Sequence, residues 1–300
     1  MGAIPPAPLP FEMRYFHGVG ERHIPPLRRV GLALLSLVIL AAAQLAAIGI
    51  GQLAWTVTRL PALGNGISAA LYPVFALSGL WALCRFGLKE SLSACRIAPF
   101  RLRPVWCVSA FLLPGLVCGI YLLLPGTWVQ VQDPPDAGVM VTSGILFMGF
   151  AAAIVEEAVF RGVIMTALER RWGRAAAVLL PSVLFGGVHI IGSDLSPLSM
   201  LQLVLAGTAV GVLFSLVALE SGNIWNGALI HAVWNSALLC LLHIGPQADP
   251  SAFFNYVPTS SSFLLTGGEY GVEASLISLA GYLLFAGLAW GMIRKRNLAA

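Results

Sequence analysis

Six side chains that could do chemistry lie in stretches of the sequence that are otherwise apolar. They are Glu156, Glu157 and Arg161, then His189, and then His231 with Asn235. Carboxylates and imidazoles accept and release protons, so they can activate water or protonate a leaving group. If these stretches cross a membrane, each ionisable side chain is costly there and normally faces the protein interior for a function. The sequence therefore predicts a site for acid–base chemistry among its helices.

Helical spacing places these residues on particular faces. Glu157 and Arg161 are four residues apart, so in a helix they share a face and can form a buried ion pair. Glu156 points about 100° away from Glu157, which leaves its carboxylate available. Two further pairs have the same four-residue spacing: Phe185 with His189, and His231 with Asn235. One carboxylate of the first motif can thus be structural while the other is chemical.

The stretches that carry these residues have the composition of membrane helices. Hydrophobic residues make up 58% of the 300-residue chain and charged residues 10%, against roughly a quarter in soluble domains, which excludes an ordinary water-soluble fold. About 20 apolar helical residues cross a hydrocarbon core of roughly 30 Å. Eight windows without Asp, Glu, Lys or Arg supply about that length: 30–58, 60–84, 104–132, 137–155, 175–193, 195–219, 221–248 and 274–293. We expect an all-α polytopic membrane bundle of about eight transmembrane helices.

The basic residues indicate how such a bundle is oriented. With the N-terminus in the cytoplasm, 15 of the 17 Lys and Arg residues fall on cytoplasmic segments, as the positive-inside rule predicts. Arg59 is the exception outside, and Arg161 lies within a helix. We expect a multi-pass protein of the cell (inner) membrane with both termini cytoplasmic. The net charge of +4 suits anionic lipid headgroups and gives no reason to expect nucleic-acid binding.

Three regions follow from this layout. Residues 1–29 are rich in proline and are expected to form a cytoplasmic N-terminal arm. Residues 30–293 are expected to form a single transmembrane bundle, with the motifs at about 150–240, and 294–300 a basic cytoplasmic tail.

Helical rise sets the expected depth of the candidate residues. Glu156 lies 14 residues before Arg170, and His189 lies 15 residues after Arg174. Each is therefore roughly 21 to 22 Å along its helix from the turn between those two arginines. A helical hairpin would bring Glu156 and His189 level, and we expect His231 and Asn235 to meet them in one chamber.

The three motifs together resemble those of a known family. In chain order they are Glu156-Glu157-x3-Arg161, Phe185-x3-His189 and His231-x3-Asn235. On successive helices of a polytopic protein, this order resembles the CAAX protease and bacteriocin-processing family (CPBP, also called Abi). These proteins are intramembrane endopeptidases and include the CAAX prenyl endopeptidase. The resemblance covers about residues 150–240 and the eight-helix layout.

The resemblance implies a role for each residue in hydrolysis of an amide bond. Glu156 would take a proton from a water held by His189, while His231 and Asn235 would face the developing oxyanion. The pairing of Glu157 with Arg161 would fix the helix, and Phe185 would shape the substrate cleft. Two mechanisms stay open. Glu156, His189 and His231 form a known type of catalytic zinc set and would hold one divalent ion, or the glutamate would activate water without a metal.

We therefore expect an intramembrane endopeptidase that cuts near the terminus of a membrane-associated substrate. A prenylated CAAX-type protein, a bacteriocin leader and a sorting tail are the candidate substrates, and membrane lipids are the other expected partners.

Simpler interpretations compete with this one. Glu157 and Arg161 can be only a lock between helices, Phe185 only packing, and His231 only a hydrogen bond to a neighbouring helix. A cluster of charges in a membrane also suits a proton-coupled transporter. A non-catalytic bacteriocin-immunity or scaffold protein is the third class.

Overall fold

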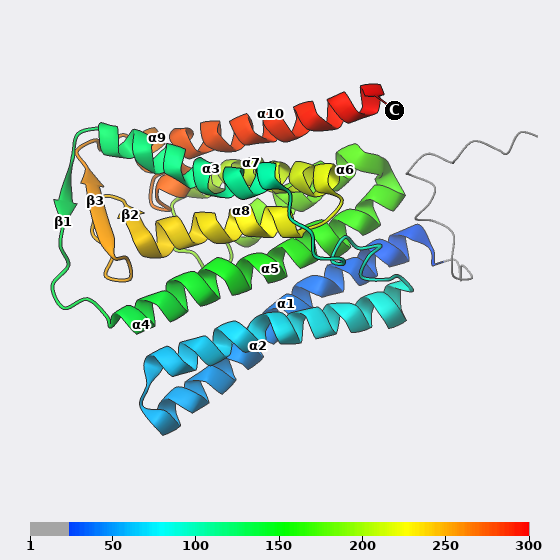
Figure 1. Cartoon of the computed structure of the whole chain (residues 1–300), viewed down its shortest axis with the longest axis horizontal. Helices are drawn as coiled ribbons and strands as arrows, with labels where there is room; N and C mark the ends of the chain where they lie inside the picture. The colour runs from blue at the N-terminus through cyan, green and yellow to red at the C-terminus, as the bar shows by residue number, and fades with distance from the viewer. Residues whose placement is uncertain (1–23, 300) are drawn as a thin grey trace, which may run out of the picture.

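The computed structural model describes residues 24–299, which form a bundle of long helices with a small sheet at one end (Figure 1). The long helices are α1 (Pro26–Thr58), α2 (Pro61–Ala82), α3 (Pro104–Leu123), α6 (Met165–Val188), α7 (Pro197–Ser221), α8 (Trp225–Ser236) and α10 (Leu276–Ala299). The short helices are α4 (Ala137–Met140), α5 (Ala152–Glu157), α9 (Phe263–Thr266) and the 3₁₀ turn η6 (Val272–Ala274). Wider π-helical segments extend or join them: η2 (Leu83–Leu88), η3 (Val141–Ala151), η4 (Ala158–Ile164) and η5 (Ala237–Leu241). The strands are β1 (Gly126–Val129), β2 (Leu242–Ile244) and β3 (Phe254–Pro258).

Four of the long helices begin with a proline. Pro26, Pro61, Pro104 and Pro197 each occupy the first turn of their helix, where the missing N–H is not needed and the fixed φ suits the start. Helix α7 ends at Ser221, and the next residue, Gly222, adopts the left-handed conformation that glycine accepts without strain. The chain can therefore turn back sharply into α8, the helix that carries His231.

The structure confirms a polytopic helical membrane protein. Among the described residues, six helices are long and apolar enough to cross a membrane. One of the six runs over Ala137–Val188 and contains two of the predicted windows. Gly173 interrupts it with a non-helical backbone (φ 79°, ψ −178°), and there the ribbon folds back into a hairpin in Figure 1.

The predicted count of eight spans differs from these six for two physical reasons. First, helical structure continues on both sides of Gly173, so windows 137–155 and 175–193 lie in one element of 52 residues. Second, window 221–248 forms only the 12 residues of α8 and the 5 of η5, which is short for a span. The remaining windows each contain one long apolar helix.

The all-α expectation is wrong where the chain leaves the bundle. The three strands form one sheet in the order β1-β3-β2, with β3 antiparallel to β1 and parallel to β2. Window 104–132 thus stops being helical after Leu123, and window 221–248 after Leu241. Outside the helices the backbone N–H and C=O groups need partners, and short segments rich in aromatic and β-branched residues find them in each other.

The predicted ends of the bundle also shift. Helix α1 begins at Pro26, so the expected boundary of the arm at residue 29 falls inside the first turn of a helix. Residues 1–23 of that arm lie outside the described residues. At the other terminus α10 continues to Ala299, so the three basic residues at 294–296 lie in the last turns of a helix.

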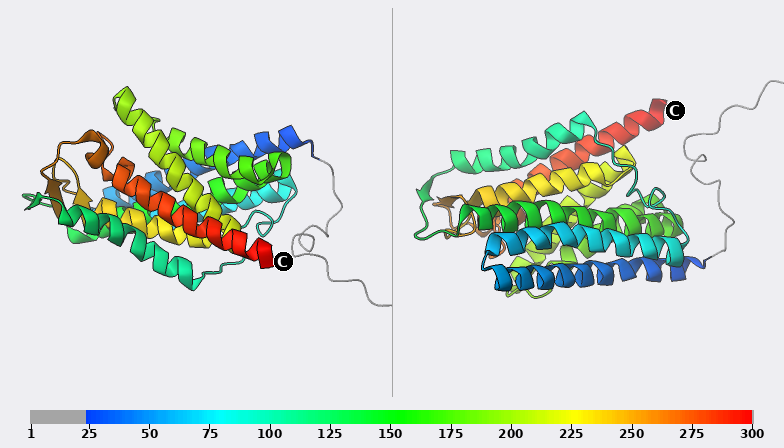
Figure 2. Two further views of the ribbon diagram at one scale, coloured as in Figure 1. Left: turned by 90° about the horizontal axis from the view of Figure 1, so that it is seen from above. Right: turned by 60° about the horizontal axis from the view of Figure 1, so that its bottom comes forward.

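The helices form two packed groups. Figures 1 and 2 show the α1–α2 hairpin alongside the hairpin of α4 to α6. The apolar residues between these hairpins make one core cluster. Helices α3, α7, α8 and α10 form the second cluster. Helices α6 and α7 connect the two groups and pack closely where Gly186 faces Gly207. A Cβ added to Gly207 would lie only 2.6 Å from Gly186 Cα. The candidate residues lie where these clusters meet.

The two ends of the bundle differ in charge. We call one the basic end; it holds the start of α1, the turn at Gly173 and the end of α10. Its ion pairs include Arg29–Glu90, Arg170–Glu90, Arg96–Glu169 and Arg103–Glu220. We call the other the sheet end; it holds the three strands and the loops 189–196 and 259–275.

Candidate active site

Glu157 and Arg161 form an ion pair in the interior. Arg161 Nη1 donates to Glu157 Oε1 over 2.9 Å, and both side chains are fully buried. Arg161 stands on η4, where the helix widens, and Nη2 donates to the carbonyl of Gly211 on α7 over 3.2 Å. The pair predicted from the four-residue spacing is present, and it connects two helices as a lock would.

Aromatic rings surround the Arg161 guanidinium. Its central carbon lies 4.5 Å from the ring centre of Phe185, 5.2 Å from that of Phe214 and 5.7 Å from that of Phe160. Cation–π attraction to these rings offsets part of the cost of burying the charge. A planar guanidinium can contact rings, a carboxylate and a carbonyl at once, which a lysine ammonium at this position cannot do equally well.

His231 links the ion pair to the second glutamate. Its Nδ1 lies 3.3 Å from Glu157 Oε1, and its Nε2 lies 3.8 Å from Glu156 Oε2. The imidazole stacks on Phe214 with the ring centres 5.0 Å apart. Because a carboxylate only accepts hydrogen bonds, Nδ1 carries the proton toward Glu157, and Nε2 faces Glu156.

Space for Glu157 comes from a glycine on the facing helix. A Cβ added to Gly227 on α8 would lie 3.2 Å from Glu157 Oε2. Gly227 stands four residues before His231 and therefore on the same face of the helix. Spacing alone did not single out this glycine, although the shared face was a signal for it.

Glu156 keeps a free oxygen. Its side chain is 22% exposed, and within residues 24–299 its Oε2 is buried without a hydrogen-bond partner. The carboxylate that helical geometry left available thus points toward an imidazole and retains acceptor capacity for a water molecule.

His189 ends α6 and has a fixed tautomer. Its Nδ1 lies 2.7 Å from the carbonyl oxygen of Phe185, and a carbonyl accepts only, so in the neutral imidazole Nδ1 carries the hydrogen and Nε2 has the lone pair. The Phe185 ring packs edge-on against His189 at 4.8 Å and against His231 at 5.9 Å. Phe185 therefore orients both imidazoles as well as packing.

Asn235 connects α8 to η3 through one hydrogen of its amide nitrogen. Its Nδ2 donates to the carbonyl of Met148 on η3 over 3.0 Å. An amide nitrogen has two hydrogens, so the second remains available to another acceptor.

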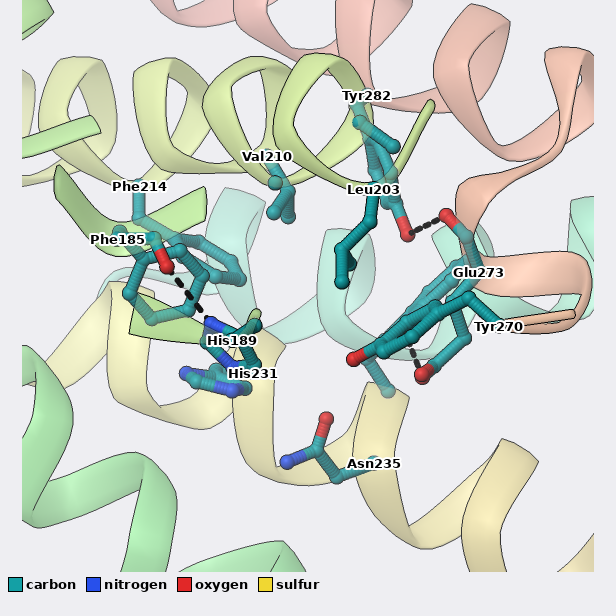
Figure 3. Close-up of a pocket in the computed structure, with 13 residues that line it drawn as sticks. Phe185, His189, Leu203, Val210, Phe214, His231, Asn235, Tyr270, Glu273 and Tyr282 are labelled. Atoms are coloured by element: carbon teal, nitrogen blue, oxygen red, sulfur yellow. Dashed lines mark hydrogen bonds between the residues drawn. The ribbon is translucent and has the colours of Figure 1, made fainter. Parts of the chain in front are cut away.

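Four of the seven predicted site residues line one cavity. Figure 3 shows this cavity, of about 60 Å³, with Phe185, His189, His231 and Asn235 on its walls. Glu156, Glu157 and Arg161 are not among its lining residues and reach it through His231. The spatial convergence expected from helical depth is therefore found for the imidazoles and the amide, with the glutamates directly behind them.

The metal interpretation needs three donors at one point. In the part of the chain that the structure describes, no three His, Cys, Asp or Glu side chains are grouped so that they could hold one ion. In particular, His231 Nδ1 is engaged by Glu157, and its Nε2 is 3.8 Å from Glu156. The residues as placed do not fit a zinc site, and no step below is assigned to a metal.

The far wall of the cavity was not predicted from sequence. It consists of Trp234 on α8, Tyr282 on α10, and Tyr270 and Glu273 in the segment that precedes α10. Trp234 Nε1 donates to Glu273 Oε1 over 3.0 Å, and the Tyr282 hydroxyl donates to the Glu273 carbonyl over 3.0 Å. Burial raises the pKa of Glu273, while the hydrogen bond from Trp234 and the nearby imidazoles of His189 and His231 act against this rise. The signal in the sequence was a glutamate directly before an apolar window.

The fold and the site together define a polytopic membrane protein in which Arg161, Glu157, His231 and Glu156 form a chain of contacts, in that order, beside a histidine-lined cavity. Residues 138–237 match the Rce1-like family model, which is described as type II CAAX prenyl endopeptidase Rce1-like. This part of the chain is a domain of that family, which is a family of proteases, and it contains all seven predicted site residues.

Comparisons with curated proteins and with solved structures gave no match. The segment that carries Tyr270, Glu273 and Tyr282 lies beyond the matched residues.

Proposed function

We propose that the protein is an intramembrane endopeptidase that cuts a membrane-associated peptide or protein near one terminus with water activated by Glu156. The observation that carries the proposal is the 3.8 Å approach of Glu156 Oε2 to His231 Nε2, next to a cavity that His189 also lines. A prenylated CAAX-type protein, a bacteriocin leader and a sorting tail are the substrates considered.

The mechanism assigns one task to each group. Glu156 accepts a proton from water, and the lone pair on His189 Nε2 holds that water in place. As imidazolium, His231 donates from Nε2 to the oxyanion, because Nδ1–H already points to Glu157, and it then supplies a proton to the leaving amine. The second amide hydrogen of Asn235 is the other oxyanion donor. Glu157 and Arg161 position His231.

We further propose eight crossings of the cell membrane with both termini in the cytoplasm. A straight helix of 52 residues would be about 78 Å long, more than twice the hydrocarbon thickness, so the turn at Gly173 separates two crossings. The short α8–η5 segment lies between neighbouring helices and adds the eighth. The basic end then faces the cytoplasm, as the positive-inside rule requires.

The test compares protein termini in membranes of cells that express wild-type protein, Glu156→Gln or Asp194→Asn. Glu156→Gln keeps the shape of the side chain but cannot accept the proton, whereas Asp194 is exposed in the loop 189–196. We expect at least one new terminus with wild type and Asp194→Asn that is missing with Glu156→Gln. Identical termini in all three would refute the proposal.

Metal analysis of the purified protein decides between the two hydrolytic mechanisms. One stoichiometric divalent ion, lost in His189→Ala and His231→Ala, would establish the metal mechanism. Full processing activity after exhaustive chelation would establish the metal-free one.

A further inference from the structure

The cavity has a size and polarity suited to one side chain. A volume of about 60 Å³ holds roughly five water-sized groups, since each needs about 10–15 Å³. Leu203, Ala206 and Val210 of α7 give the cavity an apolar lining. In Figure 3 the imidazoles of His189 and His231 lie to one side of Leu203, and Glu273 lies to the other side.

The Glu273 carboxylate is fixed in position by a hydrogen bond and can accept further ones. Trp234 fixes Oε1, and Tyr282 fixes the backbone of the same residue. Among residues 24–299, Trp234 is the one hydrogen-bond donor to this carboxylate, which can accept about four such bonds. Its burial is unfavourable for the ionised form, and a cation placed in the cavity would offset that cost.

The sheet end, which carries Glu273, is acidic. Among residues 24–299, Arg59 is the single Lys or Arg that lies at the sheet end. The acidic residues at the same end, besides Glu273, are Asp133, Asp136, Asp194, Asp249 and Glu269. Such an excess of one sign attracts cations and disfavours anionic groups.

We propose that Glu273 makes this cavity a specificity pocket for a lysine side chain of the substrate peptide. A lysine side chain has four methylene groups and one ammonium nitrogen, which together match the volume of the cavity. The methylene groups would contact the apolar lining from α7, and the ammonium group would reach the Glu273 carboxylate. His189 and His231 line the same cavity, so a lysine bound there would lie beside the proposed catalytic groups. This inference rests on the proposed function, and Glu273 lies outside the family match.

Binding is tested without any cleavage, with n-butylammonium as a probe of the lysine side chain. Thermal unfolding of the purified full-length protein is followed with n-butylammonium, with n-butanol, and with n-butyltrimethylammonium, which has no N–H to donate. We expect n-butylammonium alone to stabilise the wild type at millimolar concentration. Glu273→Gln should weaken its apparent affinity about tenfold or more, since a charge-assisted hydrogen bond is lost. Trp290→Phe, on the exposed face of α10, should leave it unchanged.

A second arm identifies the part of the peptide that carries the ammonium. Quenched fluorescent peptides contain either lysine with an acetylated N-terminus or norleucine with a free N-terminus. We expect wild type to prefer the lysine peptide and Glu273→Gln to lose the preference. Preference for the free N-terminus would show that the pocket takes an amino terminus and would overturn the assignment to lysine.

The two proposals fail in different ways. If no peptide is cut but n-butylammonium still binds through Glu273, the pocket stands and the endopeptidase assignment fails. If peptides are cut and Glu156→Gln abolishes cutting, but n-butylammonium stabilises wild type no better than n-butyltrimethylammonium, the lysine pocket is wrong. That comparison uses wild-type protein alone, so it decides the matter even if Glu273→Gln does not fold.

Discussion

Trp234 donates its indole N–H to Glu273 over 3.0 Å and so ties the helix of His231 and Asn235 to a segment 39 residues further along the chain. Residue 234 lies inside the family match and residue 273 outside it. The cavity is thus completed by a part of the chain that the family match does not include.

Trp234→Phe should lower the free energy of unfolding by about 1–3 kcal/mol, because a partly buried carboxylate loses its donor while the aromatic packing on Tyr282 remains. Denaturation in detergent micelles measures the change. Trp290→Phe, on the exposed face of α10, is the matched control and should be near neutral. Equal effects of the two substitutions would show that the hydrogen bond contributes little.

Arg161→Met should destabilise the protein by about 3–5 kcal/mol, because Glu157 would remain buried without its counter-ion. The double substitution Glu157→Gln with Arg161→Met should recover much of this loss, since no uncompensated charge is left. Processing activity should not recover, because His231 has lost the carboxylate at Nδ1. Recovery of both stability and activity would limit the pair to a structural lock.

Gly227→Ala should reduce processing about tenfold with a small change in stability. Its methyl group would displace the Glu157 carboxylate by a few tenths of an ångström, and small misplacements at a catalytic site have large kinetic effects. Gly115→Ala, where an added Cβ meets nothing within 4 Å, is the control. Unchanged kinetics in Gly227→Ala would mean that the Glu157–His231 distance does not matter.

The stability of the wild type should fall with rising pH because of Glu273. Burial raises the pKa of this carboxyl above its ordinary value of 4.5, so the folded state holds the proton more tightly than the unfolded chain. The resulting stabilisation is complete below pH 4.5 and is lost as the pH rises through the folded-state pKa. Glu273→Gln should therefore be more stable than wild type at pH 8 but not at pH 4. The measurement is the unfolding free energy at both values.

Much of the bundle follows from the cost of charges in lipid. Windows without ionised residues mark helices, and the spacing of Glu157 and Arg161 predicts their ion pair, because both arguments need only neighbouring residues. The sheet was missed, since Trp128 and Tyr256 meet only through pairing of segments far apart in sequence. The hairpin at Gly173 was expected, but the continuity of helix through it was not.

The site was predictable for the same local reasons and only to that extent. Each motif lies on one helix face, so Glu156, His189 and His231 could be named and their depths compared. Glu273 could not, because its place depends on how the segment before α10 packs on Trp234. Contacts of this kind are set by the tertiary structure as a whole.

The buried pair of Glu157 and Arg161 also constrains how the chain enters the membrane during synthesis. A helix with ionised groups at its centre is disfavoured in lipid by about 2.5–3.5 kcal/mol for each charge when no partner is present. Glu157 and Arg161 can pair with each other at once, but their further partners, His231 and the Gly211 carbonyl, are supplied by helices made later. The span of Glu156 to Arg161 should therefore stay beside the insertion machinery until α7 and α8 emerge, so that membrane insertion and the geometry of the candidate site depend on the same contacts.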